Sequence, residues 1–202
     1  MSGERRIPVQ DRAIATVEAI VEAAAQTFER LGYEQTTTNR VADRAGVSIG
    51  SLYQYFPNKD ALLLALIEDH LDDAAARLQP VLGALLRDPP PVAEGIDRLL
   101  RVTVELHAAR PALHRVLLDD APRPVGLRDR LARDEQAITA AVRQYLASCP
   151  EVTAPDLAAA AALIVRTTEA AIHGVVVRPS DEVSTAVAVG ELRRMLLAYL
   201  TG

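Results

Sequence analysis

The sequence predicts an all-α protein. Apolar residues recur at helical spacing along nearly the whole chain, and no alternating run bounded by turn residues is typical of a strand. Prolines separate the periodic segments, and half of the 202 residues are hydrophobic, enough for a substantial core. We therefore expect about nine helices, divided between a small N-terminal head, residues 1–57, and a larger helical body, residues 58–202.

The composition excludes several classes of protein. Cys149 is the only cysteine, so an intramolecular disulfide is impossible, and we expect a reducing, cytoplasmic setting. The first residues lack the apolar core of a secretory signal. The most apolar stretch, 158–177, carries Arg166, Glu169 and His173, which are costly at the centre of a bilayer. We therefore predict neither a signal peptide nor a membrane span.

The first sixty residues predict three helices. A helix over 12–31 is followed by Gly32, which is suited to a left-handed cap. Two short helices follow over 37–45 and 48–56, each beginning at a hydroxyl residue that can cap it. A pair of short helices joined by a tight turn is the pattern of a helix-turn-helix.

The second short helix is expected to face DNA. Gly46 supplies the positive φ of the turn and Ala42 allows the two helices to approach closely. A helix-turn-helix presents the N-terminal end of its second helix to the major groove, where base edges are distinguishable. The residues that we expect to contact DNA are Thr37, Thr38, Asn39, Ser48, Ile49, Gly50, Ser51, Tyr53, Gln54, Tyr55 and Lys59.

These residue types suit distinct parts of DNA. The hydroxyls of Tyr53 and Tyr55 can donate to phosphates. Gln54 can pair with adenine N6 and N7, and Ile49 can touch a thymine methyl group. Lys59 begins the next predicted helix, over 59–78, where the helix dipole already favours phosphate.

The charge of the head limits this hypothesis. Residues 1–60 hold seven basic and eight acidic side chains, and the whole chain carries a net charge of −5. DNA binding must therefore depend on the placement of a few cations rather than on a basic surface. Arg5, Arg6 and Arg12 form either a DNA-touching arm or a solvated tail.

At residues 12–63 the chain resembles the TetR family of bacterial transcriptional regulators. The matching positions are Gly32-Tyr33, Thr36-Thr37, Val41-Ala42, Ala45-Gly46-Val47-Ser48, Gly50, Leu52-Tyr53, Tyr55-Phe56, Lys59 and Leu62-Leu63. In that family Tyr53, Tyr55 and Lys59 correspond to phosphate contacts, and Ile49 and Gln54 to positions near bases. The resemblance implies a ligand-responsive repressor that binds a palindromic DNA operator as a homodimer.

The body is expected to bring two copies of the chain together. Its predicted helices span 59–78, 81–87, 92–109, 112–120, 125–148, 156–177 and 181–200. The helix over 156–177 is apolar on nearly all sides, which predicts burial on both faces. With the last helix it resembles the pair through which TetR-family proteins dimerise. The interface residues that we expect are Ile164, Ala171, Val175, Val187, Gly190 and Met195.

The resemblance also implies a small-molecule pocket among the middle helices. The candidate ligand-binding residues are Glu105, Tyr145, Arg166, Glu169 and His173. Arg166 and Glu169, three residues apart on an apolar helix, either pair with each other or meet a ligand. The four histidines are scattered without the spacing of metal ligands, so we predict no metal and no cofactor.

Two other functions are weighed against the repressor. The sequence has no glycine-rich phosphate loop, nucleophile elbow or His-Glu metal motif, so we do not expect an enzyme. A degenerate family member that acts through protein contacts, without binding DNA, is the second alternative, and the slightly acidic head is its only support.

Overall fold

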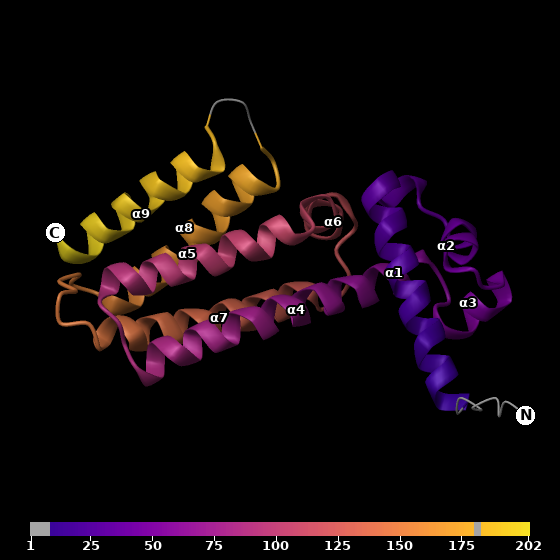
Figure 1. The fold of residues 1–202 in the computed structure, drawn as a ribbon, viewed down its shortest axis with the longest axis horizontal. Coiled ribbons are helices and arrows are strands. Elements are labelled where there is room, and N and C mark those ends of the chain that lie inside the picture. Colours follow the sequence, from indigo (N-terminus) through magenta and orange to yellow (C-terminus); the bar gives the residue numbers. More distant parts are fainter. Residues whose placement is uncertain (1–8, 180–182) are drawn as a thin grey trace, which may run out of the picture. The chain divides into compact units, whose positions relative to one another are not determined.

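The computed structural model describes residues 9–179 and 183–202, and in these ranges the chain is helical, without a strand (Figure 1). The helices are α1 (Val9–Gln35), α2 (Thr38–Ala45), α3 (Ile49–Tyr55), α4 (Lys59–Arg87), α5 (Val92–Ala109), α6 (Pro111–Arg115), α7 (Leu127–Ala147), α8 (Leu157–Val176) and α9 (Thr185–Thr201), with a π-helical turn, η1 (Val116–Asp120). The prediction of an all-α fold is confirmed.

The chain folds into two compact units. Unit 1 contains the described residues up to His70 together with Ala112–Pro124, and unit 2 contains Leu71–Pro111 and Val125–Gly202. The boundary therefore falls within α4. The division of function at residues 57 and 58 stays a prediction.

Unit 1 is built around α1, which packs against α2 and η1, while α2 packs against α3. Its core residues come from each of these elements and from the first turns of α4. They include Ile20, Phe28, Val41, Leu52, Leu62 and Leu117, all almost completely buried. The two short helices are thus held by an apolar core on one side, which leaves their other side to solvent.

Unit 2 is built around α8, which packs against α5, α7 and α9. The aliphatic core between these helices includes Leu85, Ile96, Leu146, Ile164, Ile172 and Leu196. Among the described helices, α8 alone is long and apolar enough to cross a membrane by length and composition. Ala160, Ile164 and Ile172 on α8 are part of the core of unit 2.

Two prolines behave differently from the sequence prediction. Separate helices over 59–78 and 81–87 were expected, but α4 runs without interruption through Pro80, so that prediction is wrong. Pro80 removes a hydrogen bond to the carbonyl of Ala76. Both residues are exposed, so water can solvate that carbonyl, and the segment after Pro80 is held by packing of Val81, Leu82 and Leu85 in the core. Pro111, expected to precede a helix, is instead the first residue of α6.

Three helix ends also differ in detail. The helix expected over 112–120 changes into η1, where the amide of Ala121 donates to the carbonyl of Val116 at 2.9 Å. The last helix begins at Thr185 rather than at 181, because Ser184 caps it; residues 181 and 182 lie outside the described part. Gly32 was expected to end the first helix in a left-handed cap; it interrupts α1 with φ 73° and ψ 177°, but one more helical turn follows and α1 ends at Gln35.

Tyr145, one of the candidate ligand-binding residues, is a core residue of unit 2. Its side chain is fully buried, and its hydroxyl lies 3.0 Å from the carbonyl oxygen of Pro90 and 3.1 Å from that of Pro91. Burial is the largest cause that raises the pKa of this hydroxyl. Gly95 on α5 makes room for it, because a Cβ atom there would overlap the tyrosine hydroxyl.

The substitution Gly95→Ala should therefore destabilise the protein by about 1–3 kcal/mol, the usual cost of overpacking a core. Gly83→Ala on α4 is the matched control, since its new Cβ would meet only the flexible end of Arg87. Urea unfolding at one protein concentration measures both. Equal stability of Gly95→Ala and the parent protein would contradict the assigned contact.

Candidate nucleic-acid interface

The turn between α2 and α3 is fixed by the backbone of Gly46. This residue has φ 68° and ψ 28°, a left-handed conformation that costs other residues about 1–2 kcal/mol. Its amide donates to the carbonyl of Asp43 at 3.3 Å, and the amide of Val47 donates to that of Ala42 at 3.1 Å. This pair of hydrogen bonds is a Schellman motif, which ends α2 and turns the chain towards α3.

The start of each short helix is capped by a hydroxyl, as predicted. Thr37 accepts a hydrogen bond from the amide of Arg40 at 3.3 Å, and Ser48 accepts one from the amide of Ser51 at 3.0 Å. The hydroxyls of Ser48 and Ser51 also lie 2.9 Å apart. The N-terminus of α3 is thus ordered by its own side chains.

The outward surface of the two short helices holds most of the predicted DNA contacts. The exposed residues of this set are Thr37, Asn39, Ser48, Ile49, Gly50, Tyr53, Gln54 and Tyr55. The half-buried ones are Thr38, Ser51 and Lys59. The hydroxyls of Thr38 and Tyr53 lie 3.1 Å apart and join α2 to α3. Large aromatic and aliphatic side chains without cover, such as Tyr53 at 49% exposure, are typical of a binding surface.

Lys59 is held in place by Tyr33. Its ammonium donates to the carbonyl oxygen of Tyr33 at 2.9 Å and lies 3.8 Å from the centroid of the tyrosine ring. The hydroxyl of Tyr33 donates in turn to Asp60 at 2.5 Å. The hydrogen bond to Asp60 is the main cause that raises the pKa of Tyr33 to about 12. The cation at the start of α4 is therefore positioned by neighbouring side chains before any DNA arrives.

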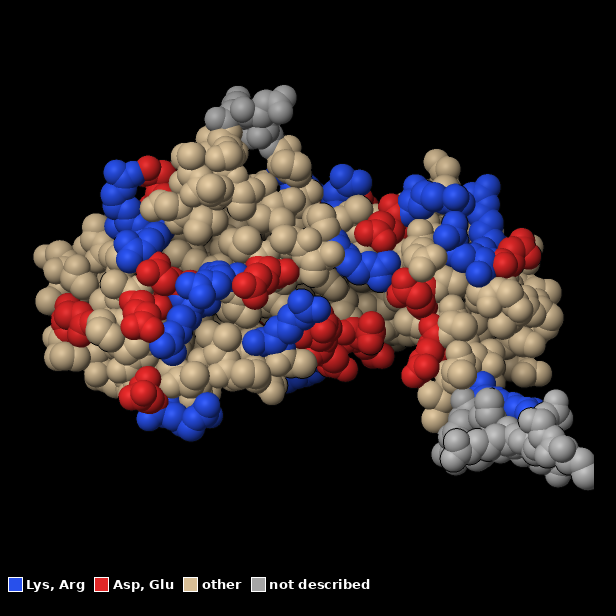
Figure 2. Space-filling model, viewed as in Figure 1, with Lys and Arg blue, Asp and Glu red and all other residues tan. Residues whose placement is uncertain are grey.

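A group of arginines on unit 1 was not predicted from the sequence. Arg30, Arg40 and Arg44 line a hollow of about 600 Å³ between α1 and α2, together with Asp43. Figure 2 shows basic side chains gathered over this part of unit 1. The i,i+4 spacing of Arg40 and Arg44 could have indicated that these two arginines share one face of a helix. Arg30 comes from another helix, and only the fold brings it near them.

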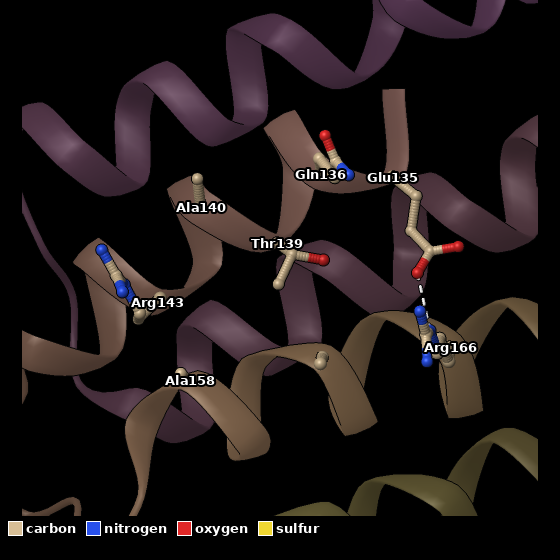
Figure 3. A pocket seen from close by; sticks show the side chains of 8 residues that line it. Glu135, Gln136, Thr139, Ala140, Arg143, Ala158 and Arg166 are labelled. Atoms are coloured by element: carbon tan, nitrogen blue, oxygen red, sulfur yellow. Dashed lines mark hydrogen bonds and ion pairs between the residues drawn. The ribbon is translucent and has the colours of Figure 1, made fainter. Parts of the chain in front are cut away.

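The predicted ligand residues of the body do not form one site. Arg166 donates to Glu135 on α7 at 2.6 Å, and both line a hollow of about 310 Å³ between α7 and α8 (Figure 3). Glu105 is exposed on α5. We had expected Arg166 either to pair with Glu169 or to meet a ligand; in the structure it pairs with Glu135 instead.

Glu169 and His173 do lie together, and they are joined by His107 from α5. The Nε2 atom of His107 lies 3.1 Å from a carboxylate oxygen of Glu169. The ring centroids of His107 and His173 are 5.8 Å apart. Burial lowers the pKa of His107, but the hydrogen bond and charge of Glu169 outweigh it and leave that pKa raised. The histidines are scattered along the sequence, but the packing of α5 on α8 brings His107 and His173 together.

The expected dimer residues differ in exposure. Val187, Gly190 and Met195 on α9 are exposed, whereas Ala171 and Val175 on α8 are half-buried. Ile164 is 2% exposed and belongs to the core of its own unit. Its assignment to an interface is wrong, because its side chain has no surface to offer a partner.

A helix-turn-helix unit followed by a helical body defines a class of bacterial regulatory proteins, and sequence comparison makes the assignment specific. The family of bacterial regulatory proteins, tetR family, matches residues 20–66, and the tetracyclin repressor-like C-terminal domain matches residues 91–200. The second match alone covers more than half of the chain. The chain belongs to the TetR family.

One curated relative is a transcriptional regulator of the helix-turn-helix type. The HTH-type transcriptional regulator RutR of Escherichia coli K12 is 34% identical over 134 residues, which are 64% of this chain and 59% of RutR. The alignment thus spans less than two thirds of that relative.

Solved structures share the fold over nearly the whole chain. A tetR-family regulatory protein from Rhodococcus RHA1 superposes with a TM-score of 0.70 at 20% identity, covering 92% of this chain and 96% of the other. FadR of Bacillus subtilis, solved in complex with stearoyl-CoA, gives a TM-score of 0.65 at 18% identity and covers 91% and 99%.

The contact between Tyr33 and Asp60 predicts a shift that spectroscopy can measure. Asp60→Asn removes the charge that stabilises the neutral phenol, so the pKa of Tyr33 should fall from about 12 towards 10. Tyrosinate absorbance across a pH titration measures it, with Tyr33→Phe identifying the signal. An unchanged titration curve in Asp60→Asn would refute the assignment.

The hydrogen bond between Tyr33 and Asp60 also makes the stability of the folded protein depend on pH. Because the folded pKa of Tyr33 lies above the unfolded value, its stabilisation is fully present below about pH 10 and is lost as the pH rises towards 12.

Proposed function

We propose that this chain is a ligand-responsive transcriptional repressor of the cytoplasm, which binds a palindromic DNA operator as a homodimer. The observation that carries the proposal is the capped α3, whose exposed face combines Ile49, Gln54 and two tyrosines. A helix of this kind fits the major groove with its N-terminal end towards the bases. Membership of the TetR family supports the same reading of the helix pair.

The face of α3 separates two kinds of contact. Gln54 offers a donor and an acceptor that match adenine, and Ile49 offers an apolar surface for a thymine methyl group. The hydroxyls of Tyr53 and Tyr55, with Lys59, suit phosphate oxygens. In this proposal the first group gives sequence preference and the second fixes the position of the head on the duplex.

Dimerisation is supported by the surface that α8 and α9 leave uncovered. Although α8 is highly apolar, only 28% of its most apolar window is buried within the protomer. Leu163 on α8 and Val187 and Met195 on α9 are each more than half exposed. Two copies that cover these faces would present two heads to half-sites about 34–36 Å apart, or a multiple of that spacing.

The effector is proposed to bind the body. FadR of Bacillus subtilis, a fold neighbour, was solved in complex with stearoyl-CoA. In this chain the hollow between α7 and α8 is lined by three alanines and by two arginines, of which Arg166 is paired with Glu135 and Arg143 is not. That combination suits a ligand with an apolar part and an acidic group.

Lys59→Ala tests the phosphate contact. On a duplex enriched from a random pool, this variant should bind more weakly, and the slope of log affinity against log salt should fall by about 1 for each head. Filter binding or fluorescence anisotropy at several salt concentrations gives both quantities. Arg87→Ala, which removes a cation from the far end of the same helix, is the control and should leave the slope unchanged.

Two outcomes would contradict the proposal at different levels. An unchanged slope in Lys59→Ala would remove the phosphate assignment, while DNA binding itself could persist. Failure of the parent protein to enrich any palindrome would favour a family member that acts through protein contacts.

Met195→Glu tests the dimer. A buried, unpaired carboxylate at an apolar interface is costly, so the variant should be monomeric at micromolar concentration, where the parent protein is dimeric. Light scattering coupled to size exclusion measures the mass. Ala76→Glu, an equal charge on the exposed side of α4, should remain dimeric. A monomeric parent protein, or a dimeric Met195→Glu, would place the interface elsewhere.

A further inference from the structure

Three metal-binding side chains meet inside unit 2. Glu169 and His173 are four residues apart on α8 and therefore share one face of that helix. His107 comes from α5, which packs directly on α8. The sequence separates His107 from Glu169 by 62 positions, so only the packing of the two helices brings them together.

The spacing of their ligand atoms is close to that of one coordination sphere. A nitrogen of His107, a nitrogen of His173 and a carboxylate oxygen of Glu169 lie within 4.8 Å of one another. Ligands at about 2.0–2.1 Å from a tetrahedral zinc ion lie about 3.4 Å apart. His107 and Glu169 are already at 3.1 Å. Small side-chain rotations would bring the third ligand into place.

The orientation of His107 is set by its other nitrogen. Its Nδ1 atom lies 2.9 Å from the carbonyl oxygen of Thr103, one turn earlier on α5, and can donate to it. Metal-binding histidines commonly make this hydrogen bond, because it fixes the tautomer and directs the second nitrogen to the metal. The His107 side chain is 5% exposed, so the ring is also held by packing.

We propose that His107, Glu169 and His173 bind one divalent transition-metal cation of the zinc type. Two imidazoles and one carboxylate suit such an ion and not Mg²⁺, which prefers oxygen ligands. The side chain of Glu169 is 58% exposed, which gives the ion a route from solvent.

The site goes beyond the proposed function, because metal binding to the body does not require DNA recognition. Without a metal, the same contact between His107 and Glu169 is an ion pair when the imidazole is protonated. A metal would replace the proton shared by these two groups. An ion pair of purely structural role would show no affinity for Zn²⁺ that depends on all three side chains, so the two accounts differ in a measurable way.

Calorimetric titration of untagged protein with Zn²⁺ tests the proposal. We expect one ion per chain, and a loss of affinity of at least about 100-fold in both Glu169→Gln and His173→Gln, beyond the 10–100-fold typical of outer-shell changes. Glu169→Gln keeps the size of the side chain, and circular dichroism verifies that each variant is folded. Co²⁺ should give visible absorption bands of a tetrahedral site, and Mg²⁺ should not bind.

Two variants serve as matched controls. Glu105→Gln removes an exposed carboxylate two residues before His107 on α5. Glu191→Gln removes an exposed carboxylate from α9. Both should bind Zn²⁺ like the parent protein.

Two results would overturn the inference: no Zn²⁺ binding by the parent protein, or equal binding by the parent and both ligand variants. The proposed function is tested separately by DNA binding in the presence of a chelator. A chain that binds DNA but no Zn²⁺ refutes only the metal site, and a chain that binds Zn²⁺ but no DNA refutes only the repressor.

Discussion

The proposed function depends on the backbone conformation at Gly46. Its positive φ and the two hydrogen bonds of the Schellman motif end α2 and direct the chain into α3. A helix of only seven residues is unstable alone, so α3 depends on the Ser48 cap at its start and on Leu52 in the core beneath it. These constraints hold one side of α3 and expose the residues proposed to contact DNA. Recognition then requires no folding of the helix on binding.

The second constraint is electrostatic. A chain with a net charge of −5 has little long-range attraction for DNA, so its few cations must be placed well. Lys59 is held by the carbonyl and ring of Tyr33, while Asp60 is engaged by the Tyr33 hydroxyl. The arginine-lined hollow between α1 and α2 adds local positive charge that a sum over the head conceals. Weak binding by a single head would make the proposed dimer, with two heads on one duplex, essential for affinity.

Local signals in the sequence were sufficient for the head and insufficient for parts of the body. The caps at Thr37 and Ser48 and the turn at Gly46 depend on neighbouring residues, and the structure has them where they were predicted. Pro80 within α4 could not be predicted, because packing of the following turns outweighs the lost hydrogen bond. The approach of His107 to Glu169 depends on contact between α5 and α8, which no spacing along the sequence encodes.

The most direct test of the account is a crystal structure of the protein on a duplex enriched from a random pool. We predict that α3 lies in the major groove of each half-site, with Gln54 and Ile49 at base edges and with Tyr53, Tyr55 and Lys59 at phosphates. A complex in which α3 lies outside the groove, or in which another surface contacts the DNA, would contradict it.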